Sequence, residues 1–144
     1  MQGQTVHVLL VEDDEIDAEQ MVRSFRKLKI ANPITIVNDG YEALNTLRGA
    51  NGYIRLPRPY IILLDINMPR MNGLEFLRAI RQDDELQRSI VFVLTTSKNE
   101  EDIVAAYASH VAGYFLKAQC AESFLALPVM MRNYWRIVDF PPDQ

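Results

Sequence analysis

A fivefold alternation of short apolar runs with segments of helical spacing is the feature that most constrains the fold. The runs occupy residues 6–11, 34–37, 60–64, 90–94 and 114–116. Several of them are continuously apolar, which is typical of parallel strands covered by helices on both faces of the sheet. Each run therefore predicts a strand. Strands and helices that alternate in this way are joined by right-handed crossovers and predict a doubly wound α/β sandwich.

The segments between the runs have the spacing of helices. After the first run, apolar side chains recur at steps of three and four residues and form one stripe, made of Ala18, Met21, Val22, Phe25 and Leu28. Asp14 is expected to cap this helix, and Asp17 adds favourable negative charge to its first turn. Four more helices are expected, at about 41–47, 74–81, 100–109 and over much of 121–138.

Length and composition limit the domain count and the partners. A chain of 144 residues that is 49% hydrophobic suits one domain, so we expect residues 1–144 to form a single unit with a core at about 5–127 and a C-terminal helix and tail at 128–144. The formal charge of −4 and the absence of a dense Lys/Arg run argue against nucleic acid as a partner. No leader and no long apolar stretch is seen, so a cytoplasmic protein without membrane contact is expected. Cys120 is the one cysteine, which excludes an internal disulfide.

Polar residues with complementary chemistry close four of the five apolar runs. The first run is followed by Glu12-Asp13-Asp14, the third by Asp65, the fourth by Thr95 and the fifth by Lys117. In an open parallel sheet, ligands collect outside the carboxyl ends of the strands, so these groups are expected to converge. Each residue alone has an ordinary explanation, such as a helix cap or a solvated lysine. Their ordered placement on four strand ends favours a site.

Carboxylates gathered in this way repel one another unless a cation or a proton neutralises them. An all-oxygen site with room for a phosphate oxygen favours Mg²⁺. One aspartate, for which Asp65 is the candidate, can then attack phosphorus and form an acyl phosphate. Lys117 and Thr95 can stabilise the negative charge on the transferring group.

Four segments together resemble the response-regulator receiver family, and the resemblance covers nearly the whole chain. They read VLLVEDD at 8–14, ILLDINMP at 62–69, VLTTS at 93–97 and GYFLK at 113–117. The resemblance implies a CheY-like, flavodoxin-like fold with strand order 2-1-3-4-5 and five helices. It also implies a non-enzymatic switch that accepts a phosphoryl group from a sensor histidine kinase and changes conformation.

The same resemblance implies roles for individual residues. Glu12, Asp13 and Asp65 would form the acidic pocket. The metal would be held by Asp13, Asp65 and the backbone carbonyl of Asn67, with Glu12 acting through a water. Asp65 would be the phosphoacceptor, and Lys117 and Thr95 would contact the phosphoryl group. Thr95 and the aromatic Tyr114 would form the conformational switch.

A narrower similarity is to the single-domain regulators that partner bacterial and cyanobacterial phytochromes. It is carried by Tyr53 and Pro57-Arg58-Pro59 in the long loop, by the triplet at 95–97 and by Tyr134-Trp135. This similarity implies a phytochrome-type kinase as the partner. The aromatic tail also suggests a homodimer through the last helix and the tail, because aromatic groups are enriched in interface cores. The alternative is that the tail packs against the chain's own sheet.

Two residues depart from the receiver pattern. The family usually has proline after the lysine, with a cis bond that aims the lysine at the pocket, and this chain has Ala118. A cis bond before a residue other than proline costs about 2.5–4 kcal/mol, so we expect Lys117 to relax away from the pocket. Phosphorylation is then expected to be weaker or slower than in a typical receiver, and to improve in Ala118→Pro. Pro128 lies within the expected last helix and predicts either a kink or a helix that begins close to it.

Two other functions compete with the phosphorylated switch. A Mg²⁺-dependent phosphohydrolase would use the same aspartyl phosphate, but such enzymes typically carry a second aspartate two residues after the nucleophile, where this chain has Asn67. A receiver-shaped interaction module that is never phosphorylated is the other alternative, and Ala118 is the feature that favours it.

Overall fold

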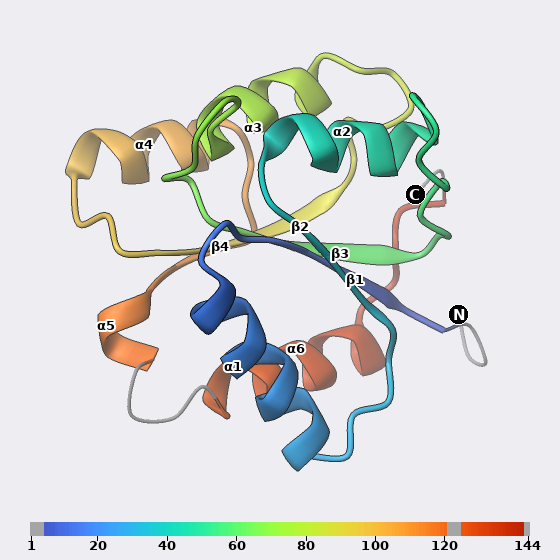
Figure 1. Cartoon of the computed structure of the whole chain (residues 1–144), viewed down its shortest axis with the longest axis vertical. Helices are drawn as coiled ribbons and strands as arrows, with labels where there is room; N and C mark the ends of the chain where they lie inside the picture. The colour runs from blue at the N-terminus through green and yellow to red at the C-terminus, as the bar shows by residue number, and fades with distance from the viewer. Residues whose placement is uncertain (1–4, 121–124, 143–144) are drawn as a thin grey trace.

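The computed structural model describes residues 5–120 and 125–142, which form one parallel sheet flanked by helices on both faces (Figure 1). The strands are β1 (His7–Val11), β2 (Ile34–Val37), β3 (Tyr60–Leu64), β4 (Ile90–Thr95) and β5 (Gly113–Leu116). They pair in parallel in the order β2-β1-β3-β4-β5. The predicted fold class and strand order are confirmed, and each predicted strand agrees with the observed one to within one residue at either end.

The helices divide into two layers that enclose the sheet. They are α1 (Glu15–Lys27), α2 (Gly40–Arg48), α3 (Gly73–Arg81), α4 (Glu100–Ala108), α5 (Lys117–Cys120) and α6 (Ala126–Ile137). Helices α2, α3 and α4 cover one face, while α1 and α6 cover the other (Figure 1). Each face has its own cluster of buried apolar side chains, because alternate residues of a strand point to opposite faces.

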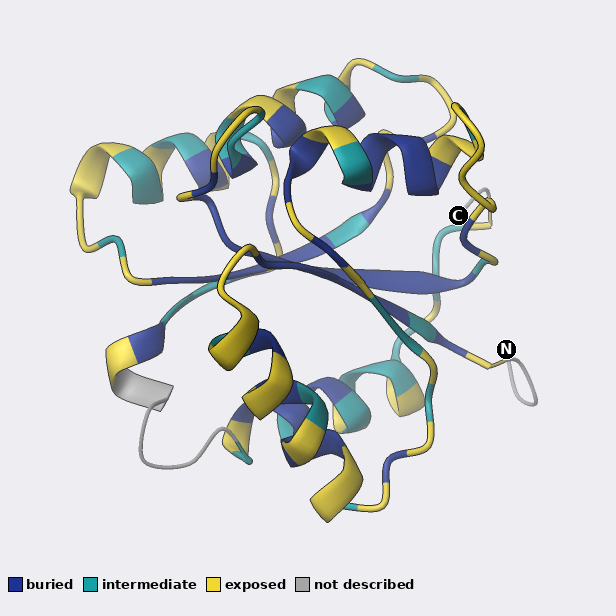
Figure 2. Ribbon diagram, in the orientation of Figure 1, coloured by how far each residue is buried: buried dark blue, intermediate teal, exposed yellow. Residues whose placement is uncertain are grey.

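Burial is deepest in the middle of the sheet. All residues of β3 are buried, and the helices expose only their outer faces (Figure 2). A strand in this position must satisfy both faces with apolar side chains, which explains its continuously apolar sequence. The hydroxyl of Tyr60, at the start of β3, shares a hydrogen bond of 2.6 Å with that of Ser89.

Side-chain caps fix the starts of the helices that follow the strand ends. Asp14 accepts hydrogen bonds from the backbone nitrogens of Ile16 and Asp17 at the start of α1, as predicted. At α3, Asn72 and Glu75 form a reciprocal capping box. These caps begin the helices immediately after the loops at the carboxyl edge of the sheet, and so hold those loops in place.

The C-terminal region differs from the single helix expected over 121–138. A one-turn helix, α5, follows β5 directly, and α6 begins only at Ala126, while residues 121–124 lie outside the described part of the chain. Pro128 is the third residue of α6. In the first turn a backbone N–H has no partner within the helix, so a proline there removes no helical hydrogen bond. Pro128 therefore lies near a helix start, which is one of the two predicted alternatives.

The aromatic residues of α6 pack inside the molecule. Tyr134 meets Phe92 of β4 edge-on at 5.2 Å between ring centroids, and Trp135 stacks near Phe25 of α1 at 6.4 Å. For these two side chains the intramolecular alternative is the observed one. Among the described residues, no helix is long and apolar enough to cross a membrane.

Candidate functional site

The predicted site residues meet at the carboxyl edge of the sheet. Glu12 and Asp13 directly follow β1, Asp65 directly follows β3, Thr95 ends β4 and Lys117 directly follows β5. The parallel strands deliver these residues to the same edge, as the strand-end reasoning predicted.

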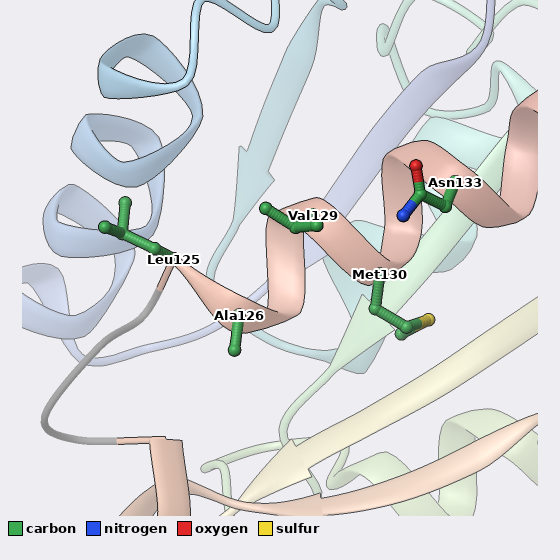
Figure 3. Close-up of a pocket in the computed structure, with 5 residues that line it drawn as sticks. All are labelled: Leu125, Ala126, Val129, Met130 and Asn133. Carbon is green, nitrogen blue, oxygen red and sulfur yellow. The ribbon is translucent and has the colours of Figure 1, made fainter.

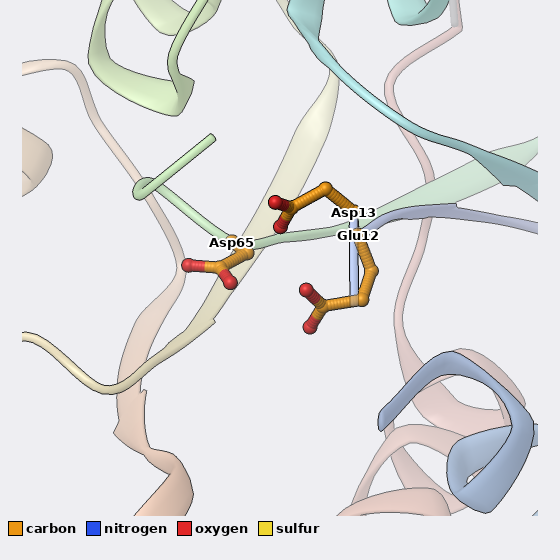
Figure 4. Close-up of side chains that lie close together, drawn as sticks. All are labelled: Glu12, Asp13 and Asp65. Atoms are coloured by element: carbon orange, nitrogen blue, oxygen red, sulfur yellow. The ribbon is translucent and has the colours of Figure 1, made fainter. Parts of the chain in front are cut away.

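Three carboxylates form the centre of the site. Glu12, Asp13 and Asp65 each offer one oxygen atom, and these atoms lie within 4.8 Å of one another (Figure 4). Glu12 and Asp65 are only 4% and 6% exposed, whereas Asp13 is exposed to solvent. Carboxylates this close to each other, two of them buried, repel unless a cation or a proton compensates their charge.

Lys117 supplies one positive charge from within the pocket. Its Nζ lies 2.6 Å from a Glu12 oxygen, 2.7 Å from an Asp17 oxygen and 3.1 Å from an Asp65 oxygen. The side chain is 9% exposed. The expectation that Lys117 relaxes away from the pocket is therefore wrong.

The backbone at Lys117 explains why proline is not needed. The cis peptide bond recorded for the described residues is Arg58–Pro59, so Lys117–Ala118 is trans. Lys117 is the first residue of α5, and the helical turn begins while the side chain still points to the carboxylates. Ion pairs to three acidic residues, rather than a cis bond, direct the ammonium group into the site.

Burial and charge shift the titration of these groups. Burial raises the pKa of the Glu12 carboxyl to about 8, and the hydrogen bond from Lys117 opposes this shift. Burial alone would lower the pKa of Lys117, but its hydrogen bonds to Asp17 and Glu12 outweigh that effect and raise the pKa above its usual range. Lys117 is therefore a permanent cation in this pocket.

One of the two carboxylate oxygens of Asp65 accepts hydrogen bonds from uncharged donors. Its Oδ1 accepts a hydrogen bond of 2.8 Å from the Thr95 hydroxyl and one of 3.0 Å from the Asn67 backbone nitrogen. Lys117 donates to Oδ2. Thr95 is completely buried, so its hydroxyl has few other partners. Hydrogen bonds to both oxygens therefore fix the orientation of the Asp65 carboxylate.

Tyr114 of β5 lies beside the loop that follows β4. Its hydroxyl donates a hydrogen bond of 3.0 Å to the backbone carbonyl of Ser97, two residues beyond Thr95. The ring is half-buried and packs against the core beneath α2, α3 and α4. The tyrosine is thus tied to the same loop that carries the threonine.

The residues present suit a hard divalent cation. The cluster offers carboxylate oxygens and no sulfur or imidazole ligand, which is the donor set preferred by Mg²⁺ and Mn²⁺. The turn after Asp65 is held by the bond from the Asn67 nitrogen to Asp65 and by Gly73, whose nitrogen donates to the Ile66 carbonyl. A cation at the cluster would also relieve the repulsion between the buried carboxylates.

Two side-chain contacts in the segments that follow the strand ends were not predicted. Asp17 was expected only to favour the start of α1, yet it contacts Lys117 across 100 positions of sequence. Arg70, in the loop after β3, binds Asp39 at 2.7 Å and stacks over Tyr41. No local pattern links either pair. An acidic residue one turn into the first helix was the only available signal for Asp17.

The fold and this pocket are those of a receiver, the phosphoacceptor class of signalling domain. Residues 8–127 match the family described as the response regulator receiver domain, and the chain belongs to that family. It is thus the receiver domain of a two-component response regulator.

The most similar proteins include phytochrome response regulators. Response regulator Rcp1 from Synechocystis sp. is 35% identical over 128 residues, which cover 89% of this chain and 87% of Rcp1. The phosphorylated cyanobacterial phytochrome response regulator RcpA superposes with a TM-score of 0.85 at 32% identity, covering 96% of this chain and 99% of RcpA. The Mn²⁺-bound form of Rcp1 has a TM-score of 0.83 at 34% identity, with coverage of 96% and 99%.

Proposed function

We propose that this chain is a single-domain response regulator that accepts a phosphoryl group on Asp65 from a histidine kinase and signals by a change of conformation. The observation that carries the proposal is the surroundings of Asp65. Its carboxylate clusters with those of Glu12 and Asp13, and it accepts hydrogen bonds from the Lys117 ammonium and the Thr95 hydroxyl. This is the environment that a carboxylate needs in order to bind a metal and to attack phosphorus.

The metal in this proposal is Mg²⁺. Asp13, Asp65 and the backbone carbonyl of Asn67 would hold it, and Glu12 would contribute through a water. When bound, Mg²⁺ neutralises charge on the carboxylates and on the phosphoryl oxygens. The Mn²⁺-bound relative supports a divalent ion at a site of this kind.

The transfer step uses the protein's own groups to place and neutralise charge. An Asp65 oxygen attacks the phosphorus of a phosphohistidine, a P–O bond forms, and the P–N bond breaks with its electron pair going to the imidazole nitrogen. Lys117 donates a hydrogen bond to a phosphoryl oxygen. The product is an acyl phosphate on Asp65.

Thr95 and Tyr114 would convert the transfer into a shape change. In the unphosphorylated chain, the Thr95 hydroxyl donates to Asp65 Oδ1, and Tyr114 donates to the Ser97 carbonyl. When a phosphoryl oxygen becomes the better acceptor, Thr95 turns toward it and draws the loop after β4 with it. Tyr114 then loses its present partner and moves inward.

The competing functions receive less support. A hydrolase would need an acid/base group at Asn67, and an amide cannot supply a proton in that role. A module that is never phosphorylated was favoured by Ala118, but Lys117 contacts Asp65 in spite of that residue. The signalling role uses Asp65, Lys117 and Thr95 together.

The proposed phosphodonor is chosen from the proteins that this chain resembles. A phytochrome-type histidine kinase is the proposed phosphodonor, because the similar protein RcpA is a cyanobacterial phytochrome response regulator. The proposed location is the cytoplasm, and neither nucleic acid nor a membrane is a proposed partner. We take residues 1–144 as one domain.

A homodimer through α6 and the tail is proposed as well. A shallow, mostly apolar pocket lies along the first turns of α6, lined by Leu125, Ala126, Val129, Met130 and Asn133 (Figure 3). Ile137, at the end of the same helix, is 86% exposed. Replacing Ile137 with Glu leaves the buried aromatic residues in place. It is expected to reduce the mass measured by sedimentation to that of one chain, and a wild-type chain that sediments as a monomer contradicts the dimer.

The phosphoacceptor role is tested with a small acyl phosphate. The wild-type chain, incubated with Mg²⁺ and acetyl phosphate, is expected to gain one phosphoryl group by intact-mass analysis and to lose it in hydroxylamine. Asp65→Asn is expected to stay unlabelled, whereas Asp84→Asn, at an exposed aspartate of the loop after α3, is expected to label normally. A labelled Asp65→Asn chain, or an unlabelled wild-type chain, would refute the proposal.

A further inference from the structure

We propose that Asp17 is a positioning residue that holds the Lys117 ammonium group in the pocket during phosphoryl transfer. This inference rests on the proposed function of Asp65 and adds a residue of α1 to the machinery. Asp17 touches neither the acidic cluster nor the expected place of the phosphoryl group, so it acts through Lys117.

The first support is the way in which the ammonium group is shared. Nζ carries three N–H donors and has three carboxylate partners, at 2.6 Å, 2.7 Å and 3.1 Å. These belong to Glu12, Asp17 and Asp65. Each donor therefore has an acceptor, and the side chain has one preferred orientation. Asp17 provides one of the two shorter contacts.

The second support is that Asp17 is the one of these partners whose charge is not required elsewhere. When the site is loaded, Asp65 would carry the phosphoryl group and help to hold the metal, and Glu12 would contribute to the metal site through a water. Asp17 alone keeps a full carboxylate for Lys117. It is therefore the contact that persists through the transfer.

The third support is the backbone at the end of β5. The Lys117–Ala118 bond is trans, so the lysine lacks the restraint that proline gives in other receivers. A long, flexible side chain loses conformational entropy when it is held in one orientation. If Asp17 already holds the lysine in the resting protein, this entropy loss does not add to the barrier of phosphoryl transfer. Asp17 supplies this restraint from α1, at 2.7 Å from the ammonium nitrogen.

Asp17 is itself held in position. Its backbone nitrogen donates a hydrogen bond of 3.1 Å to Oδ1 of Asp14, the cap of α1. The Asp17 side chain is 28% exposed, so the ion pair with Lys117 is partly shielded from solvent. The start of α1 thus connects the loop after β1 to the lysine after β5.

Asp17→Asn tests the inference because it keeps the shape and removes the charge. The matched control is Glu19→Gln, which removes one negative charge from the exposed side of the same helix, where Glu19 pairs with Arg23 at 3.5 Å. Loss of a charge-assisted hydrogen bond at this partly exposed position should lower the initial rate of labelling by acetyl phosphate about tenfold relative to the control. Mg²⁺ affinity, measured by calorimetry, should not weaken in either variant.

Ala118→Pro supplies a rescue that a purely structural role would not produce. Adding Ala118→Pro to Asp17→Asn is expected to recover most of the labelling rate, while Ala118→Pro alone changes the rate little. Equal rates for Asp17→Asn and Glu19→Gln, a faster rate in Asp17→Asn, or a parallel loss of Mg²⁺ affinity would each overturn the inference. If the wild-type chain is not labelled at all, the proposed function itself has failed, which is a separate outcome.

Discussion

Replacing Lys117 with Met should destabilise the metal-free protein more than any other single change at the site. The substitution keeps a long apolar stem but removes the ammonium group that contacts Glu12, Asp17 and Asp65. Glu12 and Asp65 are almost completely buried, so water cannot replace the lost partner. Two buried carboxyl groups are then left without a cation, and both are negatively charged once pH exceeds the raised pKa of Glu12.

The size of the effect follows from this burial. Removing one partner of a buried ion pair costs about 3–5 kcal/mol, because an uncompensated charge remains away from water. For a chain of this length, each kcal/mol lowers the melting temperature by about 2–4 °C, which gives a fall of roughly 6–20 °C. A divalent cation neutralises the same carboxylates, so the loss should be smaller in Mg²⁺ than in EDTA.

The effect should also depend on pH. Burial raises the pKa of Glu12 above that of an unfolded glutamate, and in Lys117→Met the opposing ammonium group is gone. The folded variant therefore binds a proton more tightly than the unfolded chain does, so the contribution of Glu12 to stability is complete below the pKa of an unfolded glutamate and is lost as pH rises through its folded pKa. The deficit relative to wild type should shrink between pH 8 and pH 6.

Urea unfolding in EDTA and in saturating Mg²⁺, at both pH values, measures these differences. Lys27→Met, at an exposed lysine in the last turn of α1, controls for the loss of a positive charge remote from the pocket. A fall in the free energy of unfolding of less than about 1 kcal/mol in Lys117→Met, or a fall that Mg²⁺ leaves unchanged, would refute the view that the lysine neutralises mutually repelling carboxylates.

Two of three further predictions concern the metal site and its support, and the third concerns a buried hydrogen bond at the start of β3. Mg²⁺ binding should tighten as pH rises toward 8, because burial raises the pKa of Glu12 and its carboxyl must lose the proton before it attracts a cation. In Glu12→Gln, calorimetry should find that Mg²⁺ affinity depends less on pH. Gly73→Ala should weaken Mg²⁺ binding and lower the melting temperature, since the added Cβ would lie 2.5 Å from the Ile66 Cα; an unchanged variant contradicts the tight turn. Tyr60→Phe should cost about 1–3 kcal/mol in urea unfolding by leaving the buried Ser89 hydroxyl unpaired, with labelling by acetyl phosphate unaffected.

The strands, most helix starts and the chemistry of the strand ends could be predicted without coordinates. Apolar runs and capping residues such as Asp14 act over a few neighbouring positions, so their pattern can be recognised in the sequence. The rule that parallel strands expose their carboxyl ends at one edge then brought Asp13, Asp65 and Lys117 together in the prediction.

Only the tertiary structure decided how these groups are held. Lys117 stays in the pocket despite Ala118, because α1 places Asp17 opposite the end of β5, 100 positions away. Trp135 turns inward because Phe25 of α1 lies across from it. Such contacts depend on how helices pack over the sheet, and that packing balances many distant side chains. No local periodicity specifies this packing. The acidic cluster could therefore be predicted from the sequence, whereas the contact between Asp17 and Lys117 could not.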